Sequence, residues 1–205
     1  AVWVFIMNSL IMTALRFYAG PIVHRFSPIG VLVMSAALAI LGLLSLWQAA
    51  GYVLIAASIF YAVGKTFLWS TTLGLVSEQF PKGGALTLNG VSAVGVLGMG
   101  ILGTTLAGNW IDQGVDRDLK DAHPALHEKV KGETKSTFVG PAPSLDDNAM
   151  SSLSKEDQTK VVAIQDNQKK SAFARQAIFP VFMLVCYIVL FVYFRRRGGY
   201  QPVEI

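Results

Sequence analysis

The chain has 205 residues, of which 53% are hydrophobic and 15% are charged, and its formal net charge is +4. Of the 30 charged residues, 21 lie between Asp112 and Arg175, where 11 acids nearly balance 10 bases. No stripe of Lys and Arg interleaved with aromatic residues occurs, which argues against nucleic acid as a partner. Because a soluble protein spreads charge over its whole surface, the two long stretches with little charge predict a membrane protein.

Five segments are apolar enough to cross a bilayer, whose hydrocarbon core of about 30 Å needs about 20 helical residues. Proline and glycine interrupt them at Gly20-Pro21, Ser27-Pro28, Ala50-Gly51 and Pro81-Lys82-Gly83-Gly84. These short connections make consecutive helices antiparallel neighbours. The predicted fold is therefore all-α, a polytopic transmembrane helical bundle. Its four spans within residues 1–111 are about 1–19, 29–47, 52–76 and 85–110; the fifth is 176–194, and a tail 195–205 follows.

A long polar segment, 112–175, separates the fourth span from the fifth. Its first half favours loop or disorder, because Gly-Pro and Ser-rich sequence runs through 140–154. From Ser154 the pattern changes: Ser154-x-x-Asp157 resembles a capping box, and apolar residues follow among charges. We therefore expect a solvent-exposed helix over about 155–174.

Lys and Arg in the short connections predict the orientation. Arg25, Lys82 and Arg195-Arg196-Arg197 lie on one side, and the connection after the second span has no basic residue. The C-terminus is therefore expected in the cytoplasm, with segment 112–175 outside. These features predict an integral, multi-pass protein of the plasma (inner) membrane, with the lipid bilayer as its surroundings.

The third span carries a polar and aromatic stripe. Five residues fall within an arc of roughly 80° at about 100° per residue: Ser58, Tyr61, Lys65, Trp69 and Thr72. Lys65 lies about 20 Å from the start of this span, near the middle of a bilayer. An ammonium there normally faces a cavity or a counter-charge, which favours substrate binding or ion coupling. A structural ion pair, or a lysine that snorkels from a tilted helix, is the alternative.

The other spans offer weaker candidates. Asn8 adds a polar group to the first span, and Arg16 lies about one turn from its cytoplasmic end, where a gating role and simple snorkelling are both open. The run from Gly98 to Gly103 matches G-x-G-x-x-G, but no strand precedes it, so close helix packing and bending are favoured over dinucleotide binding. The glycines assigned to packing are Gly95, Gly98, Gly103 and Gly108.

No pattern points to catalysis. His123 and His127 have a spacing that metal ligands use on a helix, but Pro124 lies between them and no cysteine is near, so a solvated loop is favoured over a metal site. The spans lack a nucleophile–base set and paired carboxylates. We therefore expect no enzyme activity, no metal and no cofactor.

Three stretches resemble the major facilitator superfamily of transporters. Gly20 and Arg25 fit that family's cytoplasmic loop motif, although His24 stands where the family usually has Asp and Ser27 where it usually has Gly. Residues 64–85 resemble the family's tenth helix and the loop after it, and residues 90–112 resemble its glycine-rich eleventh helix. The resemblance covers about 140 residues and implies helices eight to twelve of a twelve-helix carrier.

The resemblance implies secondary active transport of a small solute by alternating access, coupled to protons or sodium, with the N-terminal half of the same chain missing. Lys65, Tyr61, Trp69, Ser58, Thr72 and Asn8 would line the substrate or ion pathway. Gly20, Arg25, Glu78 and Arg16 would form the cytoplasmic gate. The alternative is a membrane scaffold or receptor that acts through the external segment 112–175.

Overall fold

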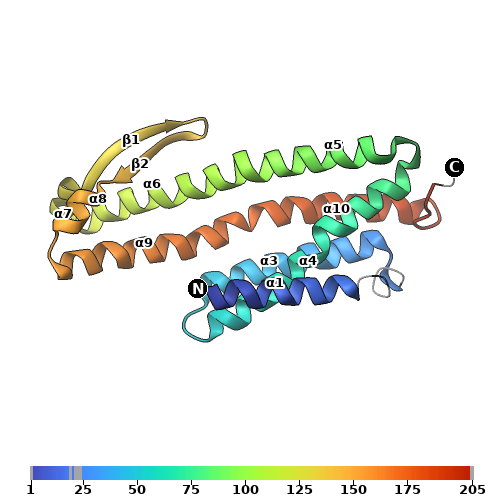
Figure 1. Ribbon diagram of the computed structural model, residues 1–205, viewed down its shortest axis with the longest axis horizontal. Helices are drawn as coiled ribbons and strands as arrows, with labels where there is room; N and C mark the ends of the chain where they lie inside the picture. Colours follow the sequence, from blue (N-terminus) through green and yellow to red (C-terminus); the bar gives the residue numbers. More distant parts are fainter. Residues whose placement is uncertain (1, 19, 21–24, 204–205) are drawn as a thin grey trace. The chain divides into compact units, whose positions relative to one another are not determined.

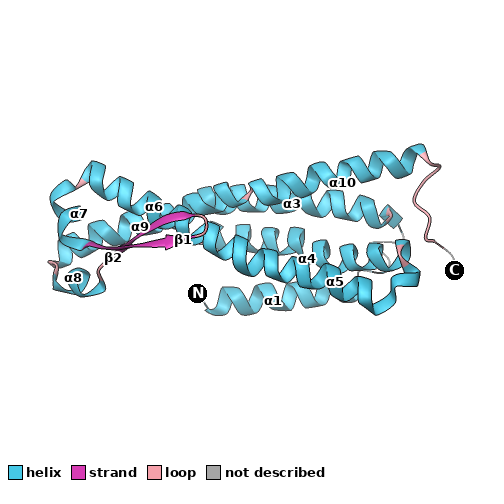
Figure 2. Ribbon diagram, turned by 90° about the horizontal axis from the view of Figure 1, so that it is seen from above, coloured by secondary structure: helices cyan, strands magenta, loops and turns pink. Residues whose placement is uncertain are grey.

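The computed structural model describes residues 2–18, 20 and 25–203. These residues are mostly helical, and the strands among them form one two-stranded hairpin (Figures 1 and 2). The chain divides into two compact units, residues 1–94 with 173–205, and residues 95–172. Each unit has its own buried apolar cluster, so each is described by itself.

The first unit is built of helices. They are α1 (Val2–Phe17), α3 (Pro28–Gln48), α4 (Val53–Gln79), the 3₁₀ turn η1 (Pro81–Gly83), most of α5 (Gly84–Leu97) and α10 (Ile178–Arg196). Ser27 caps α3, since its Oγ accepts a hydrogen bond from the N–H of Gly30 at 3.3 Å and Pro28 follows as the first helical residue. Gly51, at φ 57°, allows the tight turn into α4.

Helices α3 and α4 pack backbone against backbone through two glycines. A Cβ added to Gly42 would lie 2.6 Å from Cα of Tyr61, and one added to Gly64 would lie 2.6 Å from the backbone N of Ala39. Only a residue without a side chain allows so close an approach. Elsewhere in this unit, α3, α4 and α10 bury one apolar cluster, made of Ile29, Leu32, Ala36, Leu75 and Tyr187.

Four described helical stretches are long and apolar enough to cross a membrane: Pro28–Gln48, Val53–Gln79, Pro81–Ala122 and Lys155–Arg196. Large apolar side chains on them are exposed, including Leu86 at 84% and Phe182 at 71%. Such surfaces favour lipid over water, so the chain fits a multi-pass membrane protein. The first expected span is shorter, because α1 has 16 residues, and residues 1, 19 and 21–24 lie outside the described part.

The second unit comprises residues 95–172. Its elements are the π-helical turn η2 (Gly98–Gly103), α6 (Thr104–Ala122), α7 (Pro124–Val130), strands β1 (Lys131–Thr137) and β2 (Gly140–Leu145), α8 (Asp147–Ser152) and most of α9 (Lys155–Gln176). The strands pair antiparallel, with Thr137 opposite Gly140 at the turn. The Oγ of Ser154 accepts from the N–H of Asp157 at 3.2 Å at the start of α9, the helix expected over 155–174.

The expectation of loop or disorder after residue 112 needs correction. Helix α6 continues to Ala122, and Val115 and Leu119 on it pack with Leu126, Val130 and Val161 in a buried cluster. Ile111, Val115 and Leu119 recur every four residues, the spacing of one helix face, although polar and charged residues and one glycine stand between them. The sequence therefore contains the apolar spacing of an amphipathic helix, but the many charged residues around it made this spacing hard to recognise.

The glycine contact between α3 and α4 yields a test of stability. Gly64→Ala places a methyl group against the backbone of α3, which cannot rotate away, and is expected to cost about 1–3 kcal/mol. Gly74→Ala on the same helix is the matched control, because nothing lies within 4 Å of its added Cβ. It is expected to be neutral or to gain about 0.5–1 kcal/mol. Thermal unfolding in detergent, followed by tryptophan fluorescence, measures both; equal melting temperatures for the two variants would contradict the packing described.

Candidate functional site

Lys65 lies half-buried near the middle of α4, the thirteenth of its 27 residues. Its Nζ stands 5.1 Å from the centre of the Tyr61 ring, one turn earlier on the same helix, in a cation–π contact. Among the described residues, the Lys65 ammonium has no carboxylate within ion-pair distance. The Tyr61 ring supplies part of the stabilisation that a carboxylate would give to the Lys65 ammonium. Because the ring is neutral, it does not cancel the positive charge.

Tyr61 is held in place by the packing of α4. Its backbone faces Gly42 of α3, and its side chain packs against the cluster of Leu46, Ala49 and Ala57. Phe173 contacts the same cluster. The ring that faces Lys65 is therefore fixed on a rigid element, which is how a binding group is pre-organised.

The hydroxyl groups of Ser58 and Thr72 in the predicted stripe are already engaged. Ser58 is buried and donates to the carbonyl of Ile55 at 2.8 Å. Thr72 donates to the carbonyl of Leu68 at 2.6 Å and lies 3.2 Å from the Tyr187 hydroxyl of α10. Trp69, by contrast, is 42% exposed. Unlike Ser58 and Thr72, Lys65 and Trp69 thus have polar or aromatic surface still available to a solute.

Helix α1 packs against α4 and contributes one unsatisfied polar atom. Oδ1 of Asn8 is buried and has no hydrogen-bond partner among the described residues. A buried amide oxygen without a donor costs about 1–3 kcal/mol, so a donor is expected to reach it from elsewhere. Arg16 is exposed in the last turn of α1, which suits a residue at the membrane surface.

Glu78 ends α4 in a network with the C-terminal tail. The Tyr200 hydroxyl donates to Oε2 of Glu78 at 2.5 Å, and the N–H of Val203 donates to the Glu78 carbonyl at 3.0 Å. Nε2 of Gln79 also donates to the carbonyl of Gln201 at 2.9 Å. Burial first, and the bond to Glu78 second, raise the pKa of Tyr200 to about 12, so this hydroxyl keeps its proton at physiological pH.

The other residues of the predicted gate stand apart from that network. Gly20 and Arg25 are exposed, and no ion pair joins Arg25 to Glu78 in the described part of the chain. Residues 21–24, including His24, lie outside the described residues. The pairing of Arg25 with Glu78 stays a prediction. Sequence reasoning did not find Tyr200, because 122 residues separate it from Glu78.

The glycines assigned to helix packing lie on an open surface. Nothing comes within 4 Å of a Cβ added at Gly98 or Gly108, and Gly103 meets only the carbonyl of Gly98 in its own helix. No residue of α5 or η2, the stretch that contains Gly95, is buried. Gly98 and Gly103 instead bound the π-helical turn, which agrees with the alternative that these glycines permit bending.

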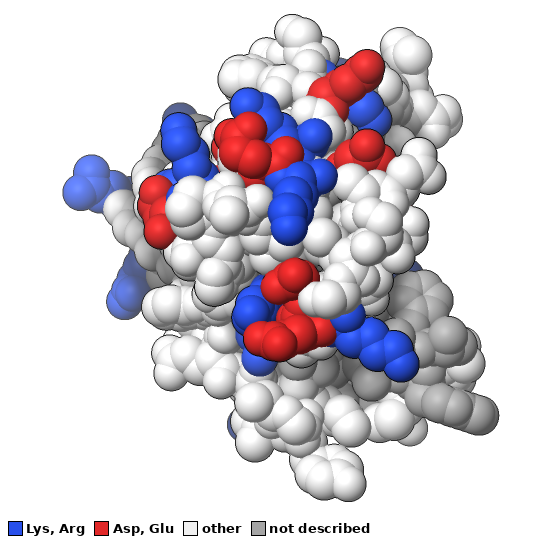
Figure 3. Space-filling model, turned by 90° about the vertical axis from the view of Figure 1, so that its left-hand side faces the viewer, with Lys and Arg blue, Asp and Glu red and all other residues white. Residues whose placement is uncertain are grey.

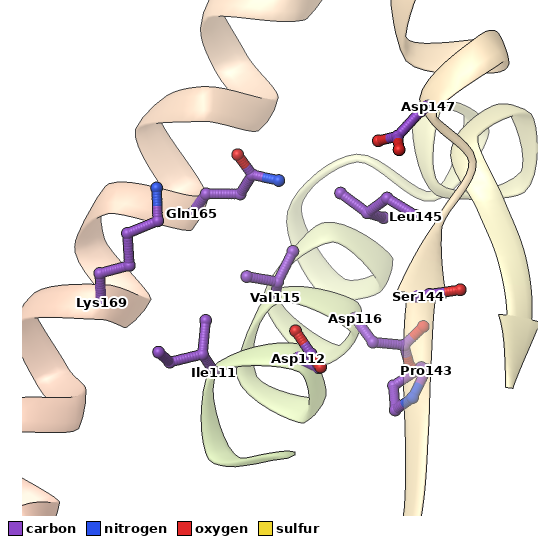
Figure 4. Close-up of a pocket in the computed structure, with 10 residues that line it drawn as sticks. All are labelled: Ile111, Asp112, Val115, Asp116, Pro143, Ser144, Leu145, Asp147, Gln165 and Lys169. Atoms are coloured by element: carbon purple, nitrogen blue, oxygen red, sulfur yellow. The ribbon is translucent and has the colours of Figure 1, made fainter. Parts of the chain in front are cut away.

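The second unit contains a separate polar pocket of about 280 Å³ (Figure 4). Gln165 and Lys169 enter it from α9, Asp112 and Asp116 from α6, and Asp147 from the start of α8. Ile111, Val115, Pro143, Ser144 and Leu145 complete the lining. Within the described residues, no three His, Cys, Asp or Glu side chains are grouped as metal ligands.

His127 is a structural residue of the second unit rather than part of a solvated loop. It lies on α7 with 4% exposure, and its Nε2 stands 2.8 Å from Oδ1 of Asp116 on α6. Gln168 of α9 likewise donates to Asp118 of α6. On the face shown in Figure 3, acidic and basic side chains are interspersed, as expected of a surface in water.

No protein-family model, characterised protein or solved structure matches this chain.

The Asp116–His127 contact can be tested by hydrogen exchange. His127→Ala removes the partner of Asp116 and leaves a void beside Leu126 and Val130, at an expected cost of about 1–3 kcal/mol. Amides of α6 beyond Ile111 and of α7 should then exchange faster, by roughly tenfold for each 1.4 kcal/mol. His123→Ala, at a half-exposed position before α7, is the control and should leave exchange unchanged. Equal exchange in both variants would refute a structural role for His127.

Proposed function

We propose that this chain is part of a secondary active transporter of a small solute. The observation that carries the proposal is Lys65, a charged residue in the middle of an apolar helix long enough to span a membrane, with no carboxylate paired to it among the described residues. Placing a lysine at the centre of a bilayer costs about 2.5–3.5 kcal/mol, so such residues mark pathways for substrates or ions.

The counter-charge for Lys65 must come from outside this helix. The acid on α4 is Glu78, which lies 13 residues further along and accepts a hydrogen bond from Tyr200. An anionic group of a solute, or a carboxylate from another part of the carrier, would satisfy the ammonium. Tyr61 would hold the Lys65 side chain in position, and Trp69 would offer a face for the solute to pack on.

An exposed glycine-rich stretch supports incorporation into a larger bundle. The glycine-rich stretch of α5 and η2 has no buried residue, and glycine-rich faces allow helices to approach closely in membranes. We therefore place the five expected spans as helices eight to twelve of a carrier of the major facilitator type. In this arrangement the protein lies in the plasma (inner) membrane, with the C-terminal tail and the Glu78 end of α4 on the cytoplasmic side. The two halves of the carrier rock around a central site.

A second candidate function is a membrane scaffold or receptor that acts through segment 112–175. The observation that favours it is the order of this segment, which has its own apolar cluster and a polar pocket. A segment that only connects two membrane spans needs neither an apolar cluster nor a polar pocket. This candidate assigns binding to the second unit and gives Lys65 no part in it.

Uptake by the full-length protein in proteoliposomes separates the two candidates. Lys65→Gln should reduce uptake about tenfold or more, the effect of losing one interaction with a charged group. Lys82→Gln is the matched control, since Lys82 is exposed in the turn after α4. Unchanged uptake and unchanged pH dependence for Lys65→Gln would refute the central role of Lys65. If Lys65→Gln is silent while deletion of 115–168 abolishes function, the second candidate is supported instead.

A further inference from the structure

The C-terminal tail folds back over the ends of α4 and α10. Three hydrogen bonds join Tyr200, Gln201 and Val203 to Glu78 and Gln79, as described above. The Tyr200 ring also packs against Phe194, with the ring centres 5.3 Å apart. The glycines at 198 and 199 have φ of 97° and 111°, which lets the chain reverse just after α10. The tail is thereby fixed as a wall at this end of the first unit.

The folded tail lines a half-open cavity of about 220 Å³ at the start of α3. Its walls are mostly apolar, because Ile29, Phe191 and Phe194 line it. The remaining described residues of the lining are Ser27, Arg195, Gly199 and Tyr200. The cavity lies where α3 begins and α10 ends, and both helices belong to stretches apolar enough to span a membrane. It therefore lies at the level of lipid headgroups.

The cavity has a basic side chain at its edge. Arg195 is the charged residue among the described lining residues, while the Glu78 carboxylate is hydrogen-bonded to the Tyr200 hydroxyl, and no ion pair among the described residues includes Arg195. Arg196 and Arg197 follow it, and the first turn of the 21-residue helix α3 adds the positive end of its dipole. An apolar wall with a guanidinium at its edge suits a molecule that has both a phosphate and methylene groups.

We propose that this cavity binds the headgroup phosphate of an anionic phospholipid. Arg195 would donate to the phosphate oxygens, and Phe191 and Ile29 would contact the glycerol backbone. The acyl chains would continue along the exposed apolar surface of α10, which includes Val185, Ile188 and Val192. Because the tail forms one wall, a bound lipid would also hold the tail against α4. The site is distinct from Lys65 and does not depend on transport.

The test is native mass spectrometry of the purified chain, stripped of lipid in an uncharged detergent and titrated with phosphatidylglycerol or phosphatidylcholine. Phosphatidylglycerol is expected to bind about tenfold more tightly than phosphatidylcholine, and Arg195→Gln should remove that preference. Arg197→Gln is the matched control, since this guanidinium lies over the Tyr193 ring at 4.7 Å and does not line the cavity. It should change the affinity less than about twofold, because general surface attraction is weak in comparison.

Phe191→Ala provides a second variant that keeps every charge, and it should weaken phosphatidylglycerol binding by opening the wall. Three results would overturn the proposal. They are equal losses for Arg195→Gln and Arg197→Gln, equal affinity for the two lipids, and displacement of the lipid by inorganic phosphate at millimolar concentration. The last result would identify a simple anion as the ligand instead.

Discussion

Backbone contact between α3 and α4 fixes the positions of the residues on which the proposed function depends. In a bilayer, helices gain little by hiding apolar side chains from one another, so association depends on close packing. Gly42 of α3 and Gly64 of α4 allow that packing at two points, which lie at Tyr61 and Gly64 on α4, a little under one turn apart. Lys65 directly follows Gly64 and is rotated by about 100° from it. It therefore lies at the edge of the contact, half-buried, with its ammonium beside Tyr61.

Sequence reasoning predicted the membrane helices better than the polar segment. Prolines and glycines bound α3 and α4, and apolar length alone indicates α10, so the described ends lie within a few residues of the expected ones. Segment 112–175 was harder, because its apolar residues are separated by charges. Its core also requires contacts between distant residues, such as Val115 with Val161, which a local pattern does not contain.

The sequence indicated which polar residues the candidate site contains. It did not indicate which of their polar groups already have hydrogen-bond partners. The stripe on the third span groups residues of α4 by helical period, yet periodicity treats every polar residue alike. Ser58 and Thr72 donate to carbonyls of their own helix, a common arrangement for hydroxyl groups in apolar surroundings. Among the described residues, the Lys65 ammonium has no ion-pair partner, and Oδ1 of Asn8 has no hydrogen-bond donor. The distinction between satisfied and unsatisfied groups appears only when the surrounding atoms are placed.

The bond between Glu78 and Tyr200 also bears on how the protein is made. The two residues are 122 positions apart, and the whole of the second unit is synthesised between them. At about 5–20 residues per second, the end of α4 waits roughly 6–24 s for the tail that closes over it. During this interval the carboxylate of Glu78 and the side chain of Gln79 lack their final partners. Early membrane insertion must therefore leave this end of the bundle open until residues 200–203 have been made.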